Sequence, residues 1–295
     1  MKKQLLLLVC TVLAFYPGLL RSQPTAQYVP GAEGIKGASL PPPGWYLRDY
    51  NLFYDANQLN DANGNDTHRK FNVFTYAQVP RVLWITDTKV LGGYLGVDAL
   101  VPFAYSRLNV APAGPYDHSH SGVGDAFGEG TWSCHLKQFD LSLGAGFWAP
   151  TGGSSQPDSA GTGYWTTMFT AGATWYADAA KTWSLSALSR YEINTQSRDT
   201  QDTRGLAYTL EWGAAKTIKT LDLGLVGYYQ DKVTSDYGLN PAGLKPFDSV
   251  AAIGPEVSMA FPKIMLFTSL RYNYEFLAYN RAQGHTVTLT LTKRF

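Results

Sequence analysis

Charged and hydrogen-bonding side chains recur at every second position in several segments of this 295-residue chain. Arg190 and Glu192 flank one tyrosine, and Arg271, Asn273 and Glu275 alternate with two others. Residues two apart lie on the same face of a β-strand, so each set marks one polar face. Rows of charge around a pore select or exclude solutes. These residues therefore indicate noncovalent selection of a solute.

Ten residues on such polar faces form a candidate constriction. Across all the polar faces, nine acids stand against two bases, a balance that would disfavour anions and tolerate cations or neutral solutes. We expect Arg190 and Arg271 each to pair with a glutamate on its own or a neighbouring strand. Such pairs would either only fill the interior or select the solute, and both interpretations stay open. The ten residues are Asp98, Arg190, Glu192, Glu211, Tyr228, Gln230, Glu256, Arg271, Asn273 and Glu275.

Metal and cofactor sites have less support. The segment DANGND (61–66) carries acid and amide oxygens at a spacing like that of a calcium loop, but it lacks the acid that completes the helix-loop-helix motif. The segment DHSH (117–120) offers two imidazoles, which bind a metal only weakly on an irregular loop. We expect no metal and no cofactor.

An enzyme is a further alternative with little support. Barrel hydrolases that act on lipids place a serine or threonine beside a histidine on the lipid-facing surface. Here four histidines lie in or next to predicted loops, and His135 lies near a short turn on the polar face. We therefore predict no catalytic residues. The four loop histidines are His68, His118, His120 and His285.

The elements that position these polar faces are β-strands. From Gly44 onward, about twelve segments alternate between apolar and polar residues, and none has the periodicity of a helix of three or four turns. In the segment 139–149, for example, the odd positions are all apolar. Pro80 predicts a bulge in the second segment, 71–86.

The connections between these segments alternate between short turns and long polar loops. This layout is typical of an up-and-down outer-membrane β-barrel, with turns in the periplasm and loops outside. An even number of strands then predicts that both termini are periplasmic. Short turns are predicted at 86–88, 137–138, 178–181, 217–219 and 262–263, and long loops at 58–68, 109–120, 150–163, 195–203 and 234–248.

Aromatic residues mark the expected membrane boundaries. Trp165 and Trp175 share a face, and a rise of ~3.3 Å per residue with a tilt of about 40° separates them by roughly 25 Å along the membrane normal. That distance matches the apolar band of an outer-membrane barrel. Phe295 ends the last strand in phase with its apolar face and is expected to act as the assembly signal. The predicted interfacial belt comprises Trp45, Trp84, Trp165, Trp175, Trp183 and Trp212.

The first 43 residues are expected to lie outside the strands. Two lysines, an apolar stretch and a Pro-Gly break predict a secretory signal over residues 1–22, with cleavage between 22 and 26. Residues 23–43 contain three consecutive prolines and several glycines and cannot form a regular strand. This segment would be either a periplasmic tail or a plug in the lumen, and the barrel would span residues 44–295.

Composition excludes several classes of protein. Without the three basic residues of the signal, 21 basic residues remain against 23 acidic ones, which argues against nucleic acid as a partner. Cys134 would be the single remaining cysteine, so no internal disulfide is expected. A soluble sandwich or lipocalin-like barrel with its apolar parity inside remains an alternative, because period two does not say which face is inside. That alternative does not explain the alternating connections, the belt or Phe295.

Several segments resemble the outer-membrane barrel family named for the meta-pathway of phenol degradation. They occur in order over nearly the whole chain after the signal. The chain departs from the family pattern after SGVGD, where AFGEGTW stands in place of an expected proline. The resemblance implies a barrel that admits aromatic or other hydrophobic compounds, with no catalytic residue to carry over. The segments are GAEG, ASLPPPGWY, KVLGGYLG, VPF, SGVGD (121–125), APTG (149–152), GTGYW (161–165), GYYQDKVTSD (227–236) and the terminal Phe295.

We therefore predict a monomeric outer-membrane barrel through which small hydrophobic or aromatic solutes diffuse down their gradient. Its expected partners are outer-membrane lipid, the barrel-insertion machinery and the solute. A structural or adhesive barrel without transport is the main alternative, and an outer-membrane lipid hydrolase is a lesser one. The sequence leaves open whether the lumen is an open pore, plugged or filled.

Overall fold

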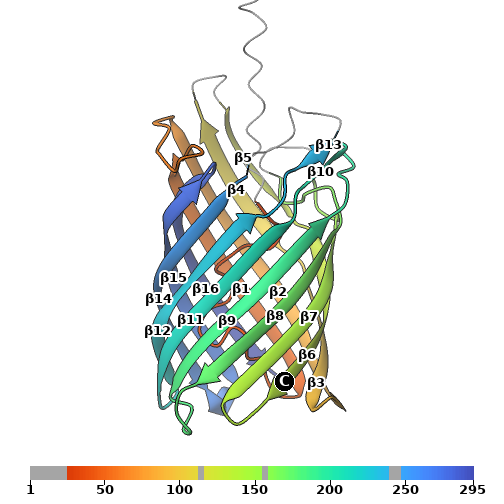
Figure 1. Cartoon of the computed structure of the whole chain (residues 1–295), viewed down its shortest axis with the longest axis vertical. Coiled ribbons are helices and arrows are strands. Elements are labelled where there is room, and N and C mark those ends of the chain that lie inside the picture. The colour runs from red at the N-terminus through yellow and green to blue at the C-terminus, as the bar shows by residue number, and fades with distance from the viewer. Residues whose placement is uncertain (1–24, 112–115, 155–158, 239–246) are drawn as a thin grey trace, which may run out of the picture.

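Alternation of apolar and polar residues produces a closed antiparallel β-barrel in the computed structural model (Figure 1). The structure describes residues 25–111, 116–154, 159–238 and 247–295. One sheet of 14 strands runs in the order β1-β16-β15-β14-β12-β11-β9-β8-β7-β6-β3-β2-β4-β5, and pairing of β1 with β2 closes it. β3 with β4, and β5 with β6, each form one interrupted crossing of the wall, so twelve strands cross it. The predicted fold is confirmed.

The strands begin and end close to the predicted segments. A second small sheet pairs β10 with β13 at the loop end. The bounds are β1 Gly44–Leu59, β2 Phe71–Val90, β3 Gly93–Leu100, β4 Phe103–Val110, β5 Tyr116–Val123, β6 Ala126–His135, β7 Phe139–Ala149, β8 Thr166–Tyr176, β9 Trp183–Asn194, β10 Asp202–Thr203, β11 Ala207–Ile218, β12 Leu221–Lys232, β13 Tyr237–Gly238, β14 Ser249–Phe261, β15 Leu266–Tyr279 and β16 Ala282–Arg294.

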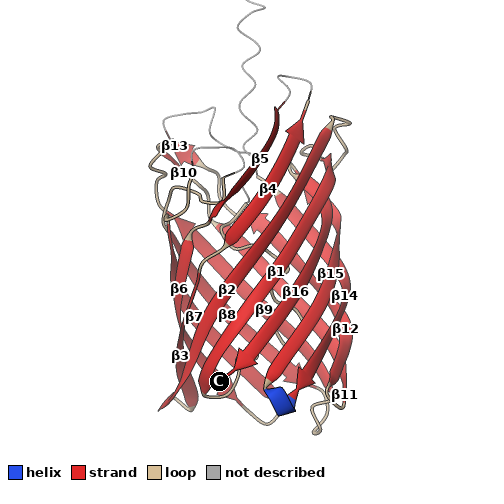
Figure 2. Cartoon of the chain, turned by 180° about the vertical axis from the view of Figure 1, so that it is seen from behind, coloured by secondary structure: helices blue, strands red, loops and turns tan. Residues whose placement is uncertain are grey.

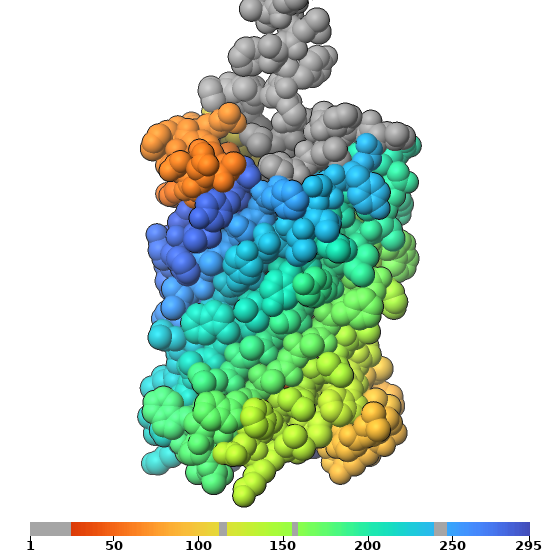
Figure 3. Space-filling view, viewed as in Figure 1, coloured from red at the N-terminus to blue at the C-terminus, as the bar shows by residue number. Residues whose placement is uncertain are grey.

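The apolar parity of the strands faces outward. On β7, Leu143 and Phe147 are more than half exposed, whereas Asp140 and Ser142 on the other parity are each 5% exposed. Figure 3 shows one side of this outer wall, along which the strands run obliquely. Oily side chains outside and polar ones inside exclude the soluble alternative, which needs the opposite arrangement. Within the described ranges, no helix has both the length and the apolar character needed to cross a membrane.

Short turns lie at one end of the barrel and longer connections at the other (Figure 2). At the turn end, β2 and β3 join through Leu91 and Gly92, both with positive φ, as a two-residue hairpin turn requires. The predicted turn at 86–88 is therefore wrong, because β2 continues to Val90. The predicted loop 109–120 is also too long, since β5 begins at Tyr116 and pairs with β4.

Pro80 does not cause the predicted bulge. Asp49 of β1 and Pro80 of β2 stay in register within an unbroken ladder. On its other edge, β2 changes partner at this point, from β4 at Gln78 to β3 at Arg81. Proline has no N–H to donate, so it fits where that edge of the strand has no partner.

Residues 25–43, here called the plug, run inside the barrel and lead into β1 (Figure 1). Thr25 donates a hydrogen bond to Asp248 at the loop end, and Pro43 accepts one from Arg294 at the turn end. Phe295 donates its N–H to the Trp45 carbonyl, also at the turn end. The first described residue and the C-terminus therefore lie at opposite ends of the barrel. The prediction that both termini are periplasmic counted only the strands and did not consider a segment that runs through the lumen. Which end of the barrel faces the periplasm stays a prediction.

Candidate lumenal site

Three glutamates of the barrel wall hold the plug by its backbone. Glu192 on β9, Glu211 on β11 and Glu256 on β14 accept hydrogen bonds of 2.8–3.0 Å from plug amides. The plug has no strand partner, so these carboxylates satisfy N–H groups that burial would otherwise leave unpaired. Residues predicted to form a constriction therefore hold a segment of the chain itself. The donors are Gln27 and Tyr28 to Glu192, Gly31 and Glu33 to Glu211, and Ile35 to Glu256.

Two further predicted residues bind plug carbonyl groups. Arg271 donates to the carbonyls of Gly31 and Ala32, and its guanidinium pairs with Glu256 at 3.3 Å. Gln230 donates to the Tyr28 carbonyl at 3.0 Å. Gly31 has a φ of 85°, which favours glycine at this sharp bend of the plug. The wall thus contacts both donors and acceptors of the plug backbone.

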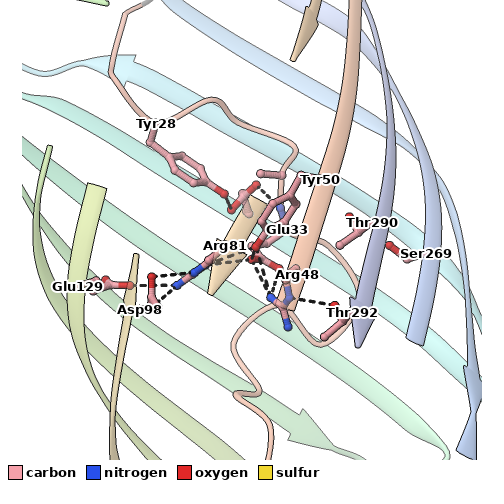
Figure 4. Close-up of polar contacts among 12 residues, drawn as sticks. Tyr28, Glu33, Arg48, Tyr50, Arg81, Asp98, Glu129, Ser269, Thr290 and Thr292 are labelled. Carbon is pink, nitrogen blue, oxygen red and sulfur yellow. Dashed lines mark hydrogen bonds and ion pairs between the residues drawn. The ribbon is translucent and has the colours of Figure 1, made fainter. Parts of the chain in front are cut away.

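The Glu33 side chain connects the plug to β1 and β2 (Figure 4). Its carboxylate accepts a hydrogen bond of 2.6 Å from the Tyr50 hydroxyl and pairs with Arg48 at 3.1 Å. Arg81 lies 3.7 Å from the same carboxylate oxygen. A buried carboxylate with this many donors persists as an ion because its partners replace the lost hydration.

Arg81 of β2 extends the network along the barrel wall to the neighbouring strands β3 and β6. It binds Asp98 through two hydrogen bonds of 2.8 Å each and contacts Glu129 at 3.3 Å. Sequence reasoning missed Arg48 and Arg81, because their strands alternate weakly. A signal existed on β1, where Arg48 shares its parity with three tyrosines. With Arg281 also in the lumen, three bases join the two predicted ones, so the excess of acids is smaller than the expected nine against two.

The other predicted residues also lie in the lumen. Glu275 accepts hydrogen bonds from Tyr228 at 2.9 Å and from Tyr54 at 3.0 Å. Asn273 is buried nearby, and its Oδ1 lacks a hydrogen-bond partner. All ten predicted lumenal residues are at most 6% exposed. Their selection of a solute stays a prediction.

An apolar cluster inside the lumen was not predicted. Phe127, Trp148 and Met168 are buried together on the polar parity of β6, β7 and β8, with Tyr28 and Leu100 packed against them. The signal was available, because three large apolar residues interrupt the polar faces of three consecutive strands. The structure alone shows that these three positions meet at one height in the barrel.

Tyr28 of the plug also contacts charged groups. Its hydroxyl donates to Glu211 at 2.6 Å, and the Arg190 guanidinium lies 3.9 Å from its ring centroid. Arg190 pairs with Glu211 at 2.5 Å, which is one of the two pairings expected for it. Tyr28 therefore lies between an apolar wall and an ion pair.

Five of the six belt tryptophans lie on the outer surface near a strand end. Trp45 and Trp84 stack with centroids 5.1 Å apart at the turn end. Trp175 and Trp183 lie at the same end, and Trp165 lies at the loop end. These five side chains are 40–54% exposed. Trp212, the sixth, lies near the middle of β11 with its ring against Gly227, so its assignment to the belt is not supported by its position.

The outer face of β1 and β2 departs from the apolar pattern. Asp49 and Asn51 share the outward parity of the exposed Leu47. Asp49 accepts hydrogen bonds of 3.1 Å from Asn51 and from Gln78, and Asn51 accepts one of 2.8 Å from Tyr76. Mutual hydrogen bonding lowers the cost of polar groups that face hydrocarbon.

The DANGND loop forms a turn. Asp61 accepts backbone hydrogen bonds from Asn65 and Asn63, which hold the pKa of its carboxyl below the ordinary value. Both bonds go to Oδ1 of Asp61. Within the described part of the chain, no group of three histidine, cysteine or acidic residues is arranged to hold a metal ion.

Comparisons with known proteins agree with the barrel. A family profile described as "Putative MetA-pathway of phenol degradation" matches residues 56–291. The COG4313 outer membrane channel from Pseudomonas putida F1 is 12% identical over 91% of this chain and 100% of that chain, with a TM-score of 0.77. The β-domain of the Bordetella autotransporter BrkA is 11% identical over 85% and 99%, with a TM-score of 0.52.

The translocator domain of the autotransporter NalP from Neisseria meningitidis is 11% identical over 85% of this chain and 89% of that chain, with a TM-score of 0.51. At such low identities these likenesses show the outer-membrane barrel fold. Among curated proteins, no sequence matches the chain.

Proposed function

This outer-membrane β-barrel belongs to the phenol-degradation family whose profile covers residues 56–291, and from that premise we propose that it is a channel for small hydrophobic or aromatic solutes. The observation that carries the proposal is the plug. It is held by hydrogen bonds from its backbone and by polar side-chain contacts such as the Glu33–Arg48 pair, and water can replace these contacts when the plug leaves. The description of the similar Pseudomonas putida structure as a channel supports the same function.

The mechanism is passive diffusion that depends on movement of the plug. A barrel of twelve strands is wide enough to leave a narrow route once its lumen is cleared. The solute then moves down its gradient along the lumen, without a cofactor. In the closed barrel, Glu192, Glu211, Glu256 and Arg271 fix the plug rather than contact the solute.

Locking the plug tests this function in whole cells. Lys36 of the plug contacts Asp222 of β12 at 2.9 Å, and both side chains are partly exposed. Lys36→Cys with Asp222→Cys, bridged by a short cleavable thiol crosslinker, should stop uptake of a labelled monoaromatic compound. Cleavage of the crosslinker should restore uptake, because it frees the plug in the same molecules.

Lys36→Cys alone, treated with the same reagent, is the matched control and should keep its uptake. If the bridged protein supports uptake as fast as the control, the solute does not need plug movement. If a strain without the gene takes up the compound as fast as one that expresses it, the barrel is structural or adhesive.

We also propose that the barrel is a monomer that enters the membrane through the insertion machinery, with Phe295 as the signal. Phe295 is 73% exposed, and its own N–H bonds Trp45 at the turn end. Phe295→Ala should reduce the amount of assembled barrel in cells but leave the stability of barrel refolded in detergent unchanged. Phe267→Ala, another outward phenylalanine, is the control and should assemble normally. Equal assembly of both variants would contradict a signal at Phe295.

A further inference from the structure

The Tyr28 side chain is a phenol group enclosed by the barrel wall. Its hydroxyl donates to the Glu211 carboxylate at 2.6 Å, and the Arg190 guanidinium lies 3.9 Å from the centre of its ring. A cation over an aromatic ring favours an electron-rich ring, and a carboxylate favours a hydroxyl donor. These two groups therefore recognise a ring that carries a hydroxyl group.

Another part of the same site is apolar. Phe127 and Trp148 lie with ring centroids 4.7 Å apart, and both are buried with Met168 against Tyr28. The Trp148 Nε1–H is buried and has no hydrogen-bond partner. A buried donor without an acceptor is costly in a structural core, and a bound solute can supply the missing acceptor. The site thus combines apolar area with an unused polar group.

The wall holds the Tyr28 backbone separately from its side chain. The Tyr28 N–H donates to Glu192, and its carbonyl accepts from Gln230. Loss of the ring therefore leaves the plug attached and the wall residues on their strands. The site for the ring belongs to the barrel, and Tyr28 only occupies it.

We propose that Glu211, Arg190 and the Phe127–Trp148–Met168 cluster form a recognition site for a neutral, hydroxyl-bearing monoaromatic solute, which Tyr28 occupies in the closed barrel. The proposal rests on the channel function above and names its solute class. A hydrocarbon such as toluene does not replace the hydrogen bond that the Tyr28 hydroxyl donates to the buried Glu211, and a carboxylated ring such as benzoate meets a like charge. Both bind more weakly than phenol.

Removal of the Tyr28 side chain tests the site directly. Calorimetric titration of phenol into Tyr28→Ala in detergent should show saturable binding, with Tyr28→Phe as the reference for partition into micelles because its ring still fills the site. Toluene should bind at least about fivefold more weakly, the ratio that ~1 kcal/mol for a lost hydrogen bond gives. Glu211→Gln in the Tyr28→Ala background should weaken the binding of phenol more than the binding of toluene.

A second variant controls for nonspecific binding of phenol to any cavity in the lumen. Tyr228 is another buried lumenal tyrosine that donates to a glutamate, Glu275 at 2.9 Å, but its buried apolar neighbours are Val250, Ala252 and Ala278. Tyr228→Ala should bind phenol about tenfold more weakly than Tyr28→Ala, as expected without a cation over the ring. Equal affinities of the two variants, or equal affinities of Tyr28→Ala for phenol and toluene, would overturn the proposal.

Two further measurements keep the test decisive. If Tyr28→Ala fails to fold, Tyr28→Val keeps an apolar contact and still frees the space beside Glu211. Binding to either variant does not depend on transport. Absent uptake with intact phenol binding would therefore contradict the channel, whereas uptake without binding would contradict this site.

Discussion

Deletion of residues 25–39 should turn a closed barrel into an open pore with a resolved unitary conductance in planar bilayers. The deletion removes the segment that fills the lumen while keeping the prolines that lead into β1. The wall glutamates and Arg271 then lose their plug partners, but water enters and solvates them. The intact protein should show low or no conductance in the same bilayers.

The same deletion also tests charge selection in the lumen. In the plug-free barrel, Glu256→Gln and Arg271→Ala should shift the reversal potential in opposite directions, because each removes one charge from the pore wall. An unchanged selectivity in both variants would count against these residues as a constriction.

A matched variant separates plug release from damage to the barrel. Glu192→Gln keeps the plug but weakens its hold on the Gln27 and Tyr28 amides, since a neutral amide oxygen accepts less strongly than a carboxylate. The Glu192→Gln variant should show brief channel openings, with a mean conductance between that of the intact protein and that of the deletion variant. If the deletion variant is folded but silent, the wall side chains close the lumen by themselves and the barrel is structural.

Arg81→Ala should destabilise the barrel by about 3–5 kcal/mol, the usual cost of removing one partner from a buried ion pair. Arg81 is 9% exposed and is the base that binds Asp98 and contacts Glu129 and Glu33. Its loss leaves buried carboxylates without their counter-ion. Urea unfolding in detergent, followed by the mobility shift of the folded barrel, measures the change.

Arg107→Ala is the control for this prediction. Arg107 pairs with Asp117 on the β4–β5 hairpin, but both side chains are more than half exposed. An exposed pair contributes about 0–1 kcal/mol, so the control should unfold near the midpoint of the unchanged protein. Equal losses for the two arginines would mean that the lumenal network is solvated and not buried.

The sequence determined the strands and their inward faces. Period two assigns each side chain to one side of a strand, and a turn that is short enough fixes the next strand as its antiparallel neighbour. The ten lumenal residues followed from this parity alone, and all ten are buried inside the barrel. The alternation did not identify Arg48 and Arg81 as lumenal residues, because it is weak in their strands. It also missed Trp148, because an apolar residue there occupies the polar face of its strand.

The tertiary structure decided what those inward faces contact. The plug has no apolar–polar alternation and no strand partner. The sequence of residues 25–43 therefore does not by itself predict where the plug lies. Its path is set by carboxylates and guanidinium groups on strands far away in sequence, as when Tyr28 meets Glu192 and Glu211. Which side of a strand each side chain faces therefore follows from the sequence, because that property is local. The closed lumen and the phenol group inside it depend on contacts between distant segments, which only the folded barrel brings together.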